Sequence, residues 1–236
     1  MKIHRFICEL EPSFSELCIN DLEVIHQIKN VLRLEAGEII EVSDGKGSVV
    51  RAKIIELEKS SIMLHAIRAI ENNMTGAINT ILYCSLLKNK NFDLVVQKAT
   101  EVGIETLVPI ITQRTVKHGF NYFRIQKIVK ESSEQCGRSS IPLVCHPMDF
   151  KEAVEDAIDN SINFFFHKDA QRFNPKEIQG KILQRVGIFI GPEGGWLDAE
   201  LELAKERNFY IRSLGKLTLR AETAAIIASY IVETGS

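Results

Sequence analysis

Short apolar runs that alternate with polar residues dominate the first part of the chain. Between residues 39 and 70 these runs are rich in β-branched side chains and are interrupted by a turn signal from Asp44 to Gly47, which predicts β-strands. Before them, apolar residues recur at helical spacing up to Gly37; they are Val24, Ile28, Val31 and Leu32. Residues 1–73 are therefore expected to form a small closed or half-closed β-barrel with one inserted helix.

The pattern changes after a polar, glycine-bearing stretch at residues 71–79. Strand-like apolar runs then alternate with amphipathic segments. The expected strands are 81–87, 106–111, 164–167, 186–190 and 210–213, and the expected helices are 92–103, 122–136, 150–157, 198–208 and 222–233. Such alternation predicts an α/β fold with a largely parallel sheet over residues 74–236.

Composition excludes several classes of protein. The chain has 236 residues, of which 45% are hydrophobic and 25% charged, as in globular proteins of one or two domains. No apolar run approaches the roughly 20 residues of a membrane span, and the N-terminus lacks the pattern of a signal peptide, so a cytoplasmic location is expected. Five cysteines without a C-x-x-C pair argue against a disulfide framework and against a metal site.

Charge is unevenly distributed although the net charge is only -2. Residues 84–140 contain nine Lys and Arg residues against five acidic ones. A local basic surface suits a nucleic-acid partner held at one face. An ordinary solvated helix surface explains the same composition equally well.

One glycine-rich loop stands out, IGPEGGW at residues 190–196. It follows a predicted buried strand and precedes a helix that Asp198 is expected to cap. The loop is either a tight corner or a backbone stripped of Cβ atoms so that a flat ligand approaches closely. Ligands of open α/β sheets bind at the carboxyl ends of the strands, where this loop lies. Dinucleotide-binding, P-loop and nucleophile-elbow patterns are absent from the sequence.

A second loop, at residues 213–220, favours the binding interpretation. It makes a turn at Leu214 and Gly215, presents apolar Leu217 and Leu219, and leads into a helix of small residues. Apolar side chains on a loop indicate either a tucked-in core or the wall of a pocket. Two such loops near strand ends favour a pocket for a flat, partly apolar ligand.

The ordered motifs of the chain resemble the RsmE family of SPOUT-class RNA methyltransferases. The matching segments are HRF at 4–6, HQIKNVLRLEAGE at 26–38, LLKNKNFDLVVQKATEVGI at 86–104, SSEQCGRSSIP at 132–142, IGPEGGW at 190–196 and LGKLTLRAETA at 214–224. They extend over nearly the whole chain. The chain departs from the family's usual last motif at Ala221, where Thr is common.

This resemblance implies a trefoil-knotted C-terminal domain, an exception to the rule against threading, preceded by a PUA/OB-like barrel. It also implies methylation of N3 of a uridine in 16S ribosomal RNA, with S-adenosylmethionine as cofactor, the assembled small subunit as substrate, and a homodimer formed through the knotted domain. The cofactor-binding residues that it implies are Phe166, His167, Ile190, Gly191, Pro192, Glu193, Gly194, Gly195, Leu214, Gly215, Leu217, Leu219 and Thr223. The missing Cβ of Gly194 is expected to leave space for adenosine, and Glu193 either binds ribose or pins the loop.

Two residues are candidates for catalysis. Uracil N3 must lose its proton, so a cationic group near O2 and O4 would help. Arg220 is the first candidate, with a phosphate clamp or a helix-end salt bridge as its alternative roles. Glu222 is the second candidate, although a carboxylate stabilised by the helix dipole explains it better. Cys136 is expected in the core, because the transfer needs no thiol.

The expected RNA contacts are His4, Arg5, Arg33, Lys88, Lys98, Arg114 and Arg138, and no metal ligand is expected. For His4 and Arg5, ordinary polar residues near the N-terminus are the alternative. Two other functions remain open: a ribose 2′-O or other base methyltransferase of the same fold, and a non-catalytic RNA-binding protein. Intact glycines at 191, 194 and 195 argue against the second.

Overall fold

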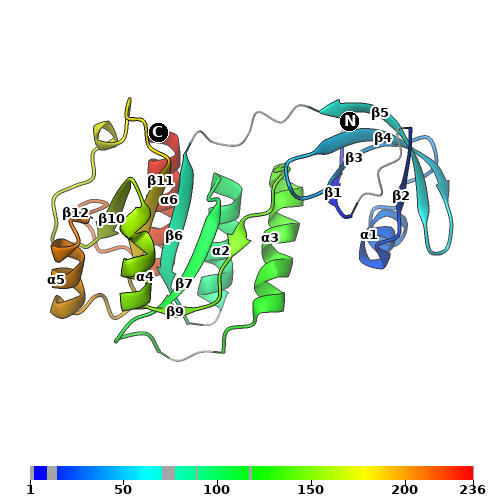
Figure 1. The fold of residues 1–236 in the computed structure, drawn as a ribbon. Helices are drawn as coiled ribbons and strands as arrows, with labels where there is room; N and C mark the ends of the chain where they lie inside the picture. The colour runs from blue at the N-terminus through cyan, green and yellow to red at the C-terminus, as the bar shows by residue number, and fades with distance from the viewer. Residues whose placement is uncertain (1–2, 10–14, 71–77, 89, 117–118, 236) are drawn as a thin grey trace. The chain divides into compact units, whose positions relative to one another are not determined.

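The computed structural model describes residues 3–9, 15–70, 78–88, 90–116 and 119–235 (Figure 1). Two compact units make up the chain: residues 1–75 with 133–141, and residues 76–132 with 142–236. The expected boundary between residues 73 and 74 lies outside the described residues. No helix in the described ranges is both long and apolar enough to cross a membrane.

The first unit is built on one curled five-stranded sheet. Its strands are β1 (Arg5–Ile7), β2 (Glu16–Ile19), β3 (Ile39–Ser43), β4 (Val49–Leu57) and β5 (Ile62–Ile70). The strand order is β1-β3-β4-β5-β2, in which β1 runs parallel to β3 and the other pairs are antiparallel. Inward-facing aliphatic residues of the sheet and of the helix form a single buried core.

The inserted helix changes its geometry half-way. It begins as α1 (Leu22–His26), which Asp21 caps by accepting hydrogen bonds from two backbone amides, and continues as a π-helix (Gln27–Val31). The amide of Leu32 donates to the carbonyl of Gln27, five residues earlier, at 2.9 Å. This wider turn breaks the 3.6-residue period. Val31, expected on the apolar face, is consequently 62% exposed.

Segment 133–141 belongs to the first unit, although the sequence pattern placed it in the second domain. Oε1 of Glu134 accepts a hydrogen bond from the backbone amide of Ile7 at 2.8 Å. The buried hydroxyl of Ser43 donates to the carbonyl of Ser139 at 2.8 Å. Strands β1 and β3 are therefore tied to a segment about a hundred residues later in the chain.

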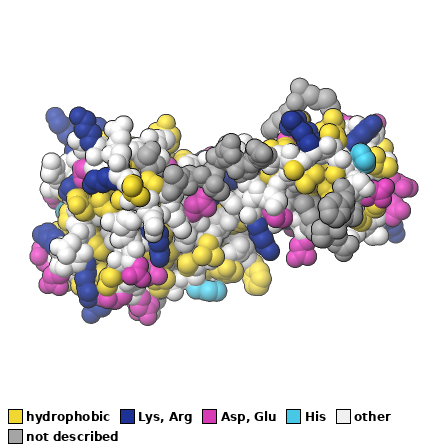
Figure 2. Space-filling model, turned by 45° about the horizontal axis from the view of Figure 1, so that its top comes forward, with side chains coloured by type: hydrophobic (Ala, Val, Ile, Leu, Met, Phe, Trp, Pro, Cys, Tyr) yellow, Lys and Arg dark blue, Asp and Glu magenta, His cyan; other side chains and the backbone are white. Residues whose placement is uncertain are grey.

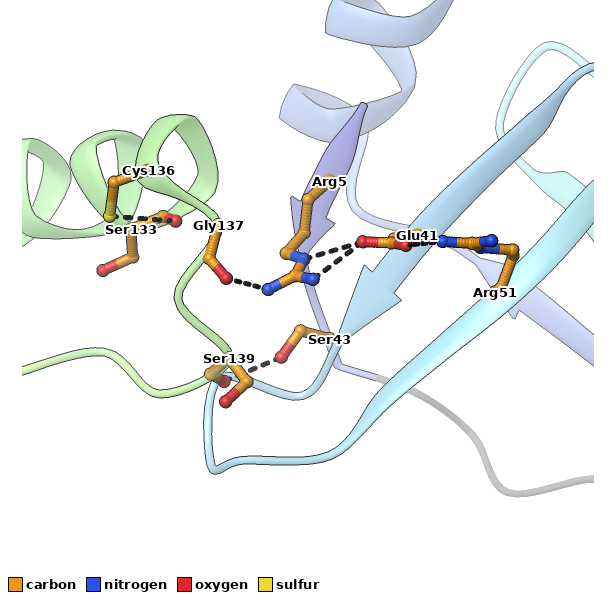
Figure 3. Close-up of polar contacts among 8 residues, drawn as sticks. All are labelled: Arg5, Glu41, Ser43, Arg51, Ser133, Cys136, Gly137 and Ser139. Atoms are coloured by element: carbon orange, nitrogen blue, oxygen red, sulfur yellow. Dashed lines mark hydrogen bonds and ion pairs between the residues drawn. The ribbon is translucent and has the colours of Figure 1, made fainter. Parts of the chain in front are cut away.

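A buried carboxylate joins three strands of this sheet (Figure 3). Oε2 of Glu41 on β3 accepts from Arg5 on β1 at 2.7 Å, and Oε1 accepts from Arg51 on β4 at 2.7 Å. Arg5 also donates to the carbonyl of Gly137. Burial alone raises the pKa of Glu41, but hydrogen bonds and positive charge from Arg51 and Arg5 outweigh it and hold the pKa below its usual value.

The second unit contains a parallel sheet. Its strands are β6 (Asn79–Ser85), β7 (Thr106–Ile111), β8 (Leu143–Val144), β9 (Met148–Asp149), β10 (Ile162–Phe166), β11 (Arg185–Ile190) and β12 (Tyr210–Arg212). The order is β12-β10-β11-β6-β7-β8, with β9 also paired to β7, and every pair is parallel. The predicted α/β class with a mostly parallel sheet is confirmed.

Helices cover both faces of this sheet. They are α2 (Lys90–Val102), α3 (Tyr122–Cys136), α4 (Phe150–Asp156), α5 (Asp198–Glu206) and α6 (Ala221–Gly235), with 3₁₀ turns at Ala157–Asp159 and Pro175–Glu177. Tyr83 of β6 shares a core cluster with Phe150 of α4 and Ala204 of α5. Thr80 of β6 hydrogen-bonds to Glu233 of α6. Since alternate side chains of a strand point to opposite faces, α4 and α5 lie on one face and α6, packed against α2, lies on the other.

Replacing the buried carboxylate by Glu41→Gln should destabilise the first unit at pH 7. Hydrogen bonds to charged groups contribute about 1.5–3 kcal/mol, and two arginines would lose their counter-charge. Because the folded pKa of Glu41 lies below the unfolded one, about 4.3, its contribution is complete above that pH and disappears as the pH falls through the folded pKa. Urea denaturation at neutral and acidic pH measures this.

The difference between the wild type and Glu41→Gln should therefore shrink in acid. Exposed Glu35 supplies the control, because Glu35→Gln removes the same charge without touching the cluster. A Glu41→Gln deficit that stays constant down to about pH 3 would contradict a role for the ionised carboxylate.

Candidate active site

A pocket of about 610 Å³ lies at the carboxyl ends of β10, β11 and β12. In a parallel sheet these ends meet at one edge, where ligands of open α/β sheets bind. The lining residues are 166–168 after β10, 190–196 and Asp198 after β11, 214–215, 217–222 and Ala224 after β12, and Arg114 after β7.

Most residues predicted to bind the cofactor line this one pocket. The structure places Phe166, His167, Ile190, Gly191, Pro192, Glu193, Gly194, Gly195, Leu214, Gly215, Leu217 and Leu219 on its wall. Thr223 is not among the lining residues. Lys168 also lines the pocket and was not predicted, although the rule that loops follow strand ends could have identified it.

The glycines of the 190–196 loop serve contacts within the protein. A Cβ on Gly191 would come within 2.8 Å of the indole ring of Trp196, and a Cβ on Gly194 would lie 3.2 Å from the side chain of Arg114. Gly195 has a φ of +71°, which side chains rarely tolerate. The expectation that Gly194 leaves space for adenosine stays a prediction; the described neighbour of a Cβ at this position is Arg114, which also lines the pocket.

Trp196 anchors the 190–196 loop to the core of the second unit. Its indole N–H donates to the carbonyl of Phe166 at 3.0 Å, which joins the ends of β10 and β11. Its ring packs 4.3 Å from that of Phe165 and 5.3 Å from that of Phe150. The tryptophan is 7% exposed, so one side chain fixes the loop to the core of the second unit.

Two neighbouring loops form hydrogen bonds with the 190–196 loop. Arg114, after β7, donates to the carbonyl of Gly194 at 2.7 Å. Oε1 of Glu193 accepts from the backbone amide of Lys88, after β6, at 3.0 Å. Of the two roles expected for Glu193, the structure thus shows the one that pins the loop.

Glu200 joins the same loops from inside. It is 6% exposed; its Oε1 accepts from the amide of Gln113 at 3.1 Å and its Oε2 from the amide of Leu197 at 2.8 Å. Leu197, not Asp198, is the N-cap of α5, and Asp198 is the first helical residue. Its position at N3 of α5 is that of a capping box, but the contact with Gln113 depends on the three-dimensional fold.

Arg220 and Glu222 both line the pocket, but their surroundings differ. Glu222 lies in the first turn of α6 and is only 8% exposed. Its Oε2 is buried and accepts no hydrogen bond from a described residue. The helix N-terminus favours its negative charge, and a buried acceptor without a donor is costly unless a ligand supplies one. Arg220 is exposed at the pocket.

Two of the predicted RNA contacts are structural. The side chain of Arg5 is 13% exposed and is held by Glu41 and Gly137, and Arg138 is 8% exposed with its Nε donating to the carbonyl of Ser140. Both were expected at an exposed surface. Arg138 is instead buried and Arg5 is partly buried, because segment 133–141 packs into the first unit.

The other predicted RNA contacts fall into separate groups. Arg33 and Lys88 are exposed, and Arg33 has a positive φ of 54°. Lys98 is paired with Glu101 on α2, and His4 is half-buried next to β1. Arg114 donates a hydrogen bond to the 190–196 loop beside the pocket. Cys136, expected in the core, is half-buried. Among the described residues, no three His, Cys, Asp or Glu side chains could together hold a metal ion.

Two models of protein families match the chain. The model of an RNA methyltransferase domain matches residues 75–233, and the model of an RNA methyltransferase PUA domain matches residues 19–64. Fold and matched domains together define a PUA-containing RNA methyltransferase.

Individual relatives identify the family within this class of RNA methyltransferases. A ribosomal RNA small subunit methyltransferase E from Synechocystis is 32% identical over 211 residues, 86% of this chain and 68% of the relative. The crystal structure of the enzyme of that name from Neisseria gonorrhoeae, bound to S-adenosylmethionine, is 26% identical with a TM-score of 0.87, covering 99% of this chain and 98% of the other. A Legionella pneumophila structure in complex with the same cofactor is 25% identical with a TM-score of 0.84, covering 99% and 98%. The chain belongs to the ribosomal RNA small subunit methyltransferase E family.

Adding one methyl group at Gly191 should disturb the tryptophan. In Gly191→Ala the Cβ meets a ring held by Phe165 and Phe166, so overpacking should destabilise the second unit by about 1–3 kcal/mol. Trp196 is the only tryptophan of the chain, so its fluorescence reports the change directly. We expect a red-shifted emission and a lower melting temperature.

Gly194→Ala is the matched control. Its Cβ would lie 3.2 Å from Cβ of Arg114, a looser contact than the 2.8 Å at Gly191, so we expect a smaller disturbance. Equal shifts in both variants would show that any added side chain disrupts the loop, and would remove the specific role of Gly191.

Proposed function

We propose that this protein methylates N3 of a uridine in 16S ribosomal RNA within the assembled small subunit, using S-adenosylmethionine. The family to which the chain belongs supports methylation of small-subunit ribosomal RNA. The observation that supports a methyl-transfer site in this chain is the pocket at the sheet's carboxyl edge, with a clamped glycine loop on one side and a buried, unpartnered carboxylate on the other.

The pocket's residues fit the cofactor. Oε2 of Glu222 lacks a hydrogen-bond donor among the described residues, and S-adenosylmethionine has donors in its ammonium and ribose groups. Leu217 and Leu219 provide apolar surface, and the loops at 190–196 and 214–220 provide backbone groups. We assign Glu222 to cofactor binding in preference to proton removal, because its buried Oε2 has room for a hydrogen-bond donor that the cofactor's ammonium or ribose groups can supply.

When bound, S-adenosylmethionine supplies an electrophilic methyl group. The chain's main contribution is then alignment, because holding two reactants in place removes much of the barrier. Trp196, Arg114 and Glu200 keep the glycine loop rigid for this purpose. Arg220 has an exposed guanidinium at the pocket and can donate to O2 or O4 of uracil, which carry the negative charge of the ring once the N3 proton has passed to water.

A homodimer, a knotted chain and a cytoplasmic location are also part of this proposal. Two exposed apolar residues share one face of α6, Ile227 at 36% and Tyr230 at 55% exposure, and Leu217 of the adjoining loop is 82% exposed. A second copy that covers this surface would give an isologous contact beside the pocket. A cytoplasmic location follows from the proposed ribosomal substrate.

The product of the reaction tests the function. Small subunits from cells lacking this protein should accept one methyl group per particle from labelled S-adenosylmethionine when the purified protein is added. Digestion to nucleosides should place the label on N3 of uridine. Label on a ribose 2′-oxygen or on another base would favour the alternative methyltransferases, and absence of both labelling and cofactor binding would favour a non-catalytic RNA-binding protein.

Substitutions of Arg220 and of Glu222 should impair different steps, catalysis and cofactor binding respectively. Arg220→Ala should lower kcat about 10²–10³-fold at saturating substrates, which is the usual effect of losing one preorganised donor. Lys should rescue poorly because it lacks the planar fork, and higher pH should partly restore the Ala variant by ionising uracil. Glu222→Gln should weaken cofactor binding about tenfold, which corresponds to roughly 1.4 kcal/mol, and should keep kcat at saturation.

Each variant is the other's control. Calorimetric titration with S-adenosylmethionine should be normal for Arg220→Ala and impaired for Glu222→Gln. If Arg220→Ala only weakens RNA binding at every pH, the arginine is a phosphate clamp. If Glu222→Gln loses kcat at saturating cofactor, the carboxylate takes part in the proton transfer instead.

A further inference from the structure

Charged residues form a continuous row across four strands of the first unit. Arg5 on β1 pairs with Glu41 on β3, Glu41 with Arg51 on β4, and Arg51 with Arg68 on β5. Cross-strand partners lie side by side on the same face of a sheet. The alternate residues of β4 and β5 are buried in the core, so this row lies on the outer face.

Among the described residues, Glu41 neutralises only part of the positive charge of this row. Glu41 is the acidic member of the row, and its two oxygens are already engaged by Arg5 and Arg51 (Figure 3). Like charges directly opposite each other on a sheet are destabilising, and Arg68 stands opposite Arg51. Among the described residues, Arg68 has no ion pair, and Nε of Arg51 has no acceptor.

A second row continues the basic surface. Lys53 of β4 pairs with His65 of β5, and both are exposed. Residues two apart on a strand are separated by about 6.6 Å, so Lys53 lies one such step from Arg51 along β4. At the end of this row is Glu16 of β2, opposite His65.

Exposed aliphatic side chains accompany these cations. The pairing of β4 with β5 shifts register twice, between Arg51 and Ala52 and between Ile54 and Glu56. These shifts leave Ile67 and Ile55 as extra residues, 48% and 52% exposed. In Figure 2, Lys and Arg side chains of the first unit lie beside hydrophobic ones and a histidine. β-Bulges often re-aim side chains at binding surfaces.

We propose that the outer face of the β4–β5 hairpin binds the phosphate backbone of the substrate RNA, with Arg68 and Lys53 as contacts. This inference rests on the proposed function, which makes RNA the partner. Arg68 in the first row and Lys53 in the second lie at separate positions on the hairpin, which suits successive phosphates of a chain better than a single anion. Arg68 offers the planar fork that binds phosphate through two hydrogen bonds. The β1 end of the first row is not part of the proposed RNA-binding surface, because segment 133–141 holds Arg5 there.

The double variant Arg68→Ala with Lys53→Ala tests the surface in the full-length protein. The probe is the small ribosomal subunit from cells lacking this protein, titrated at several KCl concentrations. We expect binding at least tenfold weaker and a salt slope reduced by about 0.7–0.9 for each phosphate that the variant no longer neutralises. Affinity for S-adenosylmethionine should be unchanged, which also shows that the variant is folded.

Lys59→Ala is the matched control, since exposed Lys59 lies in the turn of the same hairpin and outside both rows. Unchanged affinity of the double variant, or an equal loss with Lys59→Ala, would overturn the proposed surface. A loss on subunits that is absent on protein-free 16S RNA would assign the surface to a ribosomal protein and also overturn it. A wild type that binds subunits but methylates nothing would overturn the proposed function alone.

Discussion

The close passage of the glycine loop over Trp196 is the constraint on which the pocket depends. Three parallel strands end at this edge, and at the end of β10 the backbone carbonyl of Phe166 needs a hydrogen-bond partner. The indole ring provides this partner: it reaches the carbonyl of Phe166 and fills the space under Gly191. Because a Cβ at 191 would enter the ring, a glycine is required there by the protein's own packing, whatever ligand the loop binds.

Packing against Trp196 alone would not keep the loop in place if the loop could move away from the ring. Polar contacts from two other strand ends prevent this, and two of them are accepted by carboxylates, Glu193 and Glu200, from backbone amides. Such contacts depend on backbone position and not on the identity of the donating residue. The site is therefore preorganised before any ligand arrives, as catalysis by alignment requires.

The sequence predicted the second unit's elements well because their signals are local. Strand Thr106–Ile111 and helix Tyr122–Cys136 have the expected bounds, and the two loops with close glycines identified most of the pocket wall. The reason for the glycines was not predictable, because it depends on where Arg114 and Trp196 lie in three dimensions. Glu200 was missed for the same reason.

RNA contacts are harder to predict, because charge is visible in a sequence and exposure is not. Arg5 and Arg138 belong to motifs that resemble a family of RNA methyltransferases, yet Arg138 is buried and Arg5 partly buried where a distant segment returns to the first unit. Arg68 belongs to none of those motifs, and only the strand register shows that it stands opposite another arginine. Glu41 explains the difference: it neutralises the arginines it can reach and leaves the positive charge at the far end of the row. A buried carboxylate thus decides which cations stabilise the fold and which remain accessible to a partner.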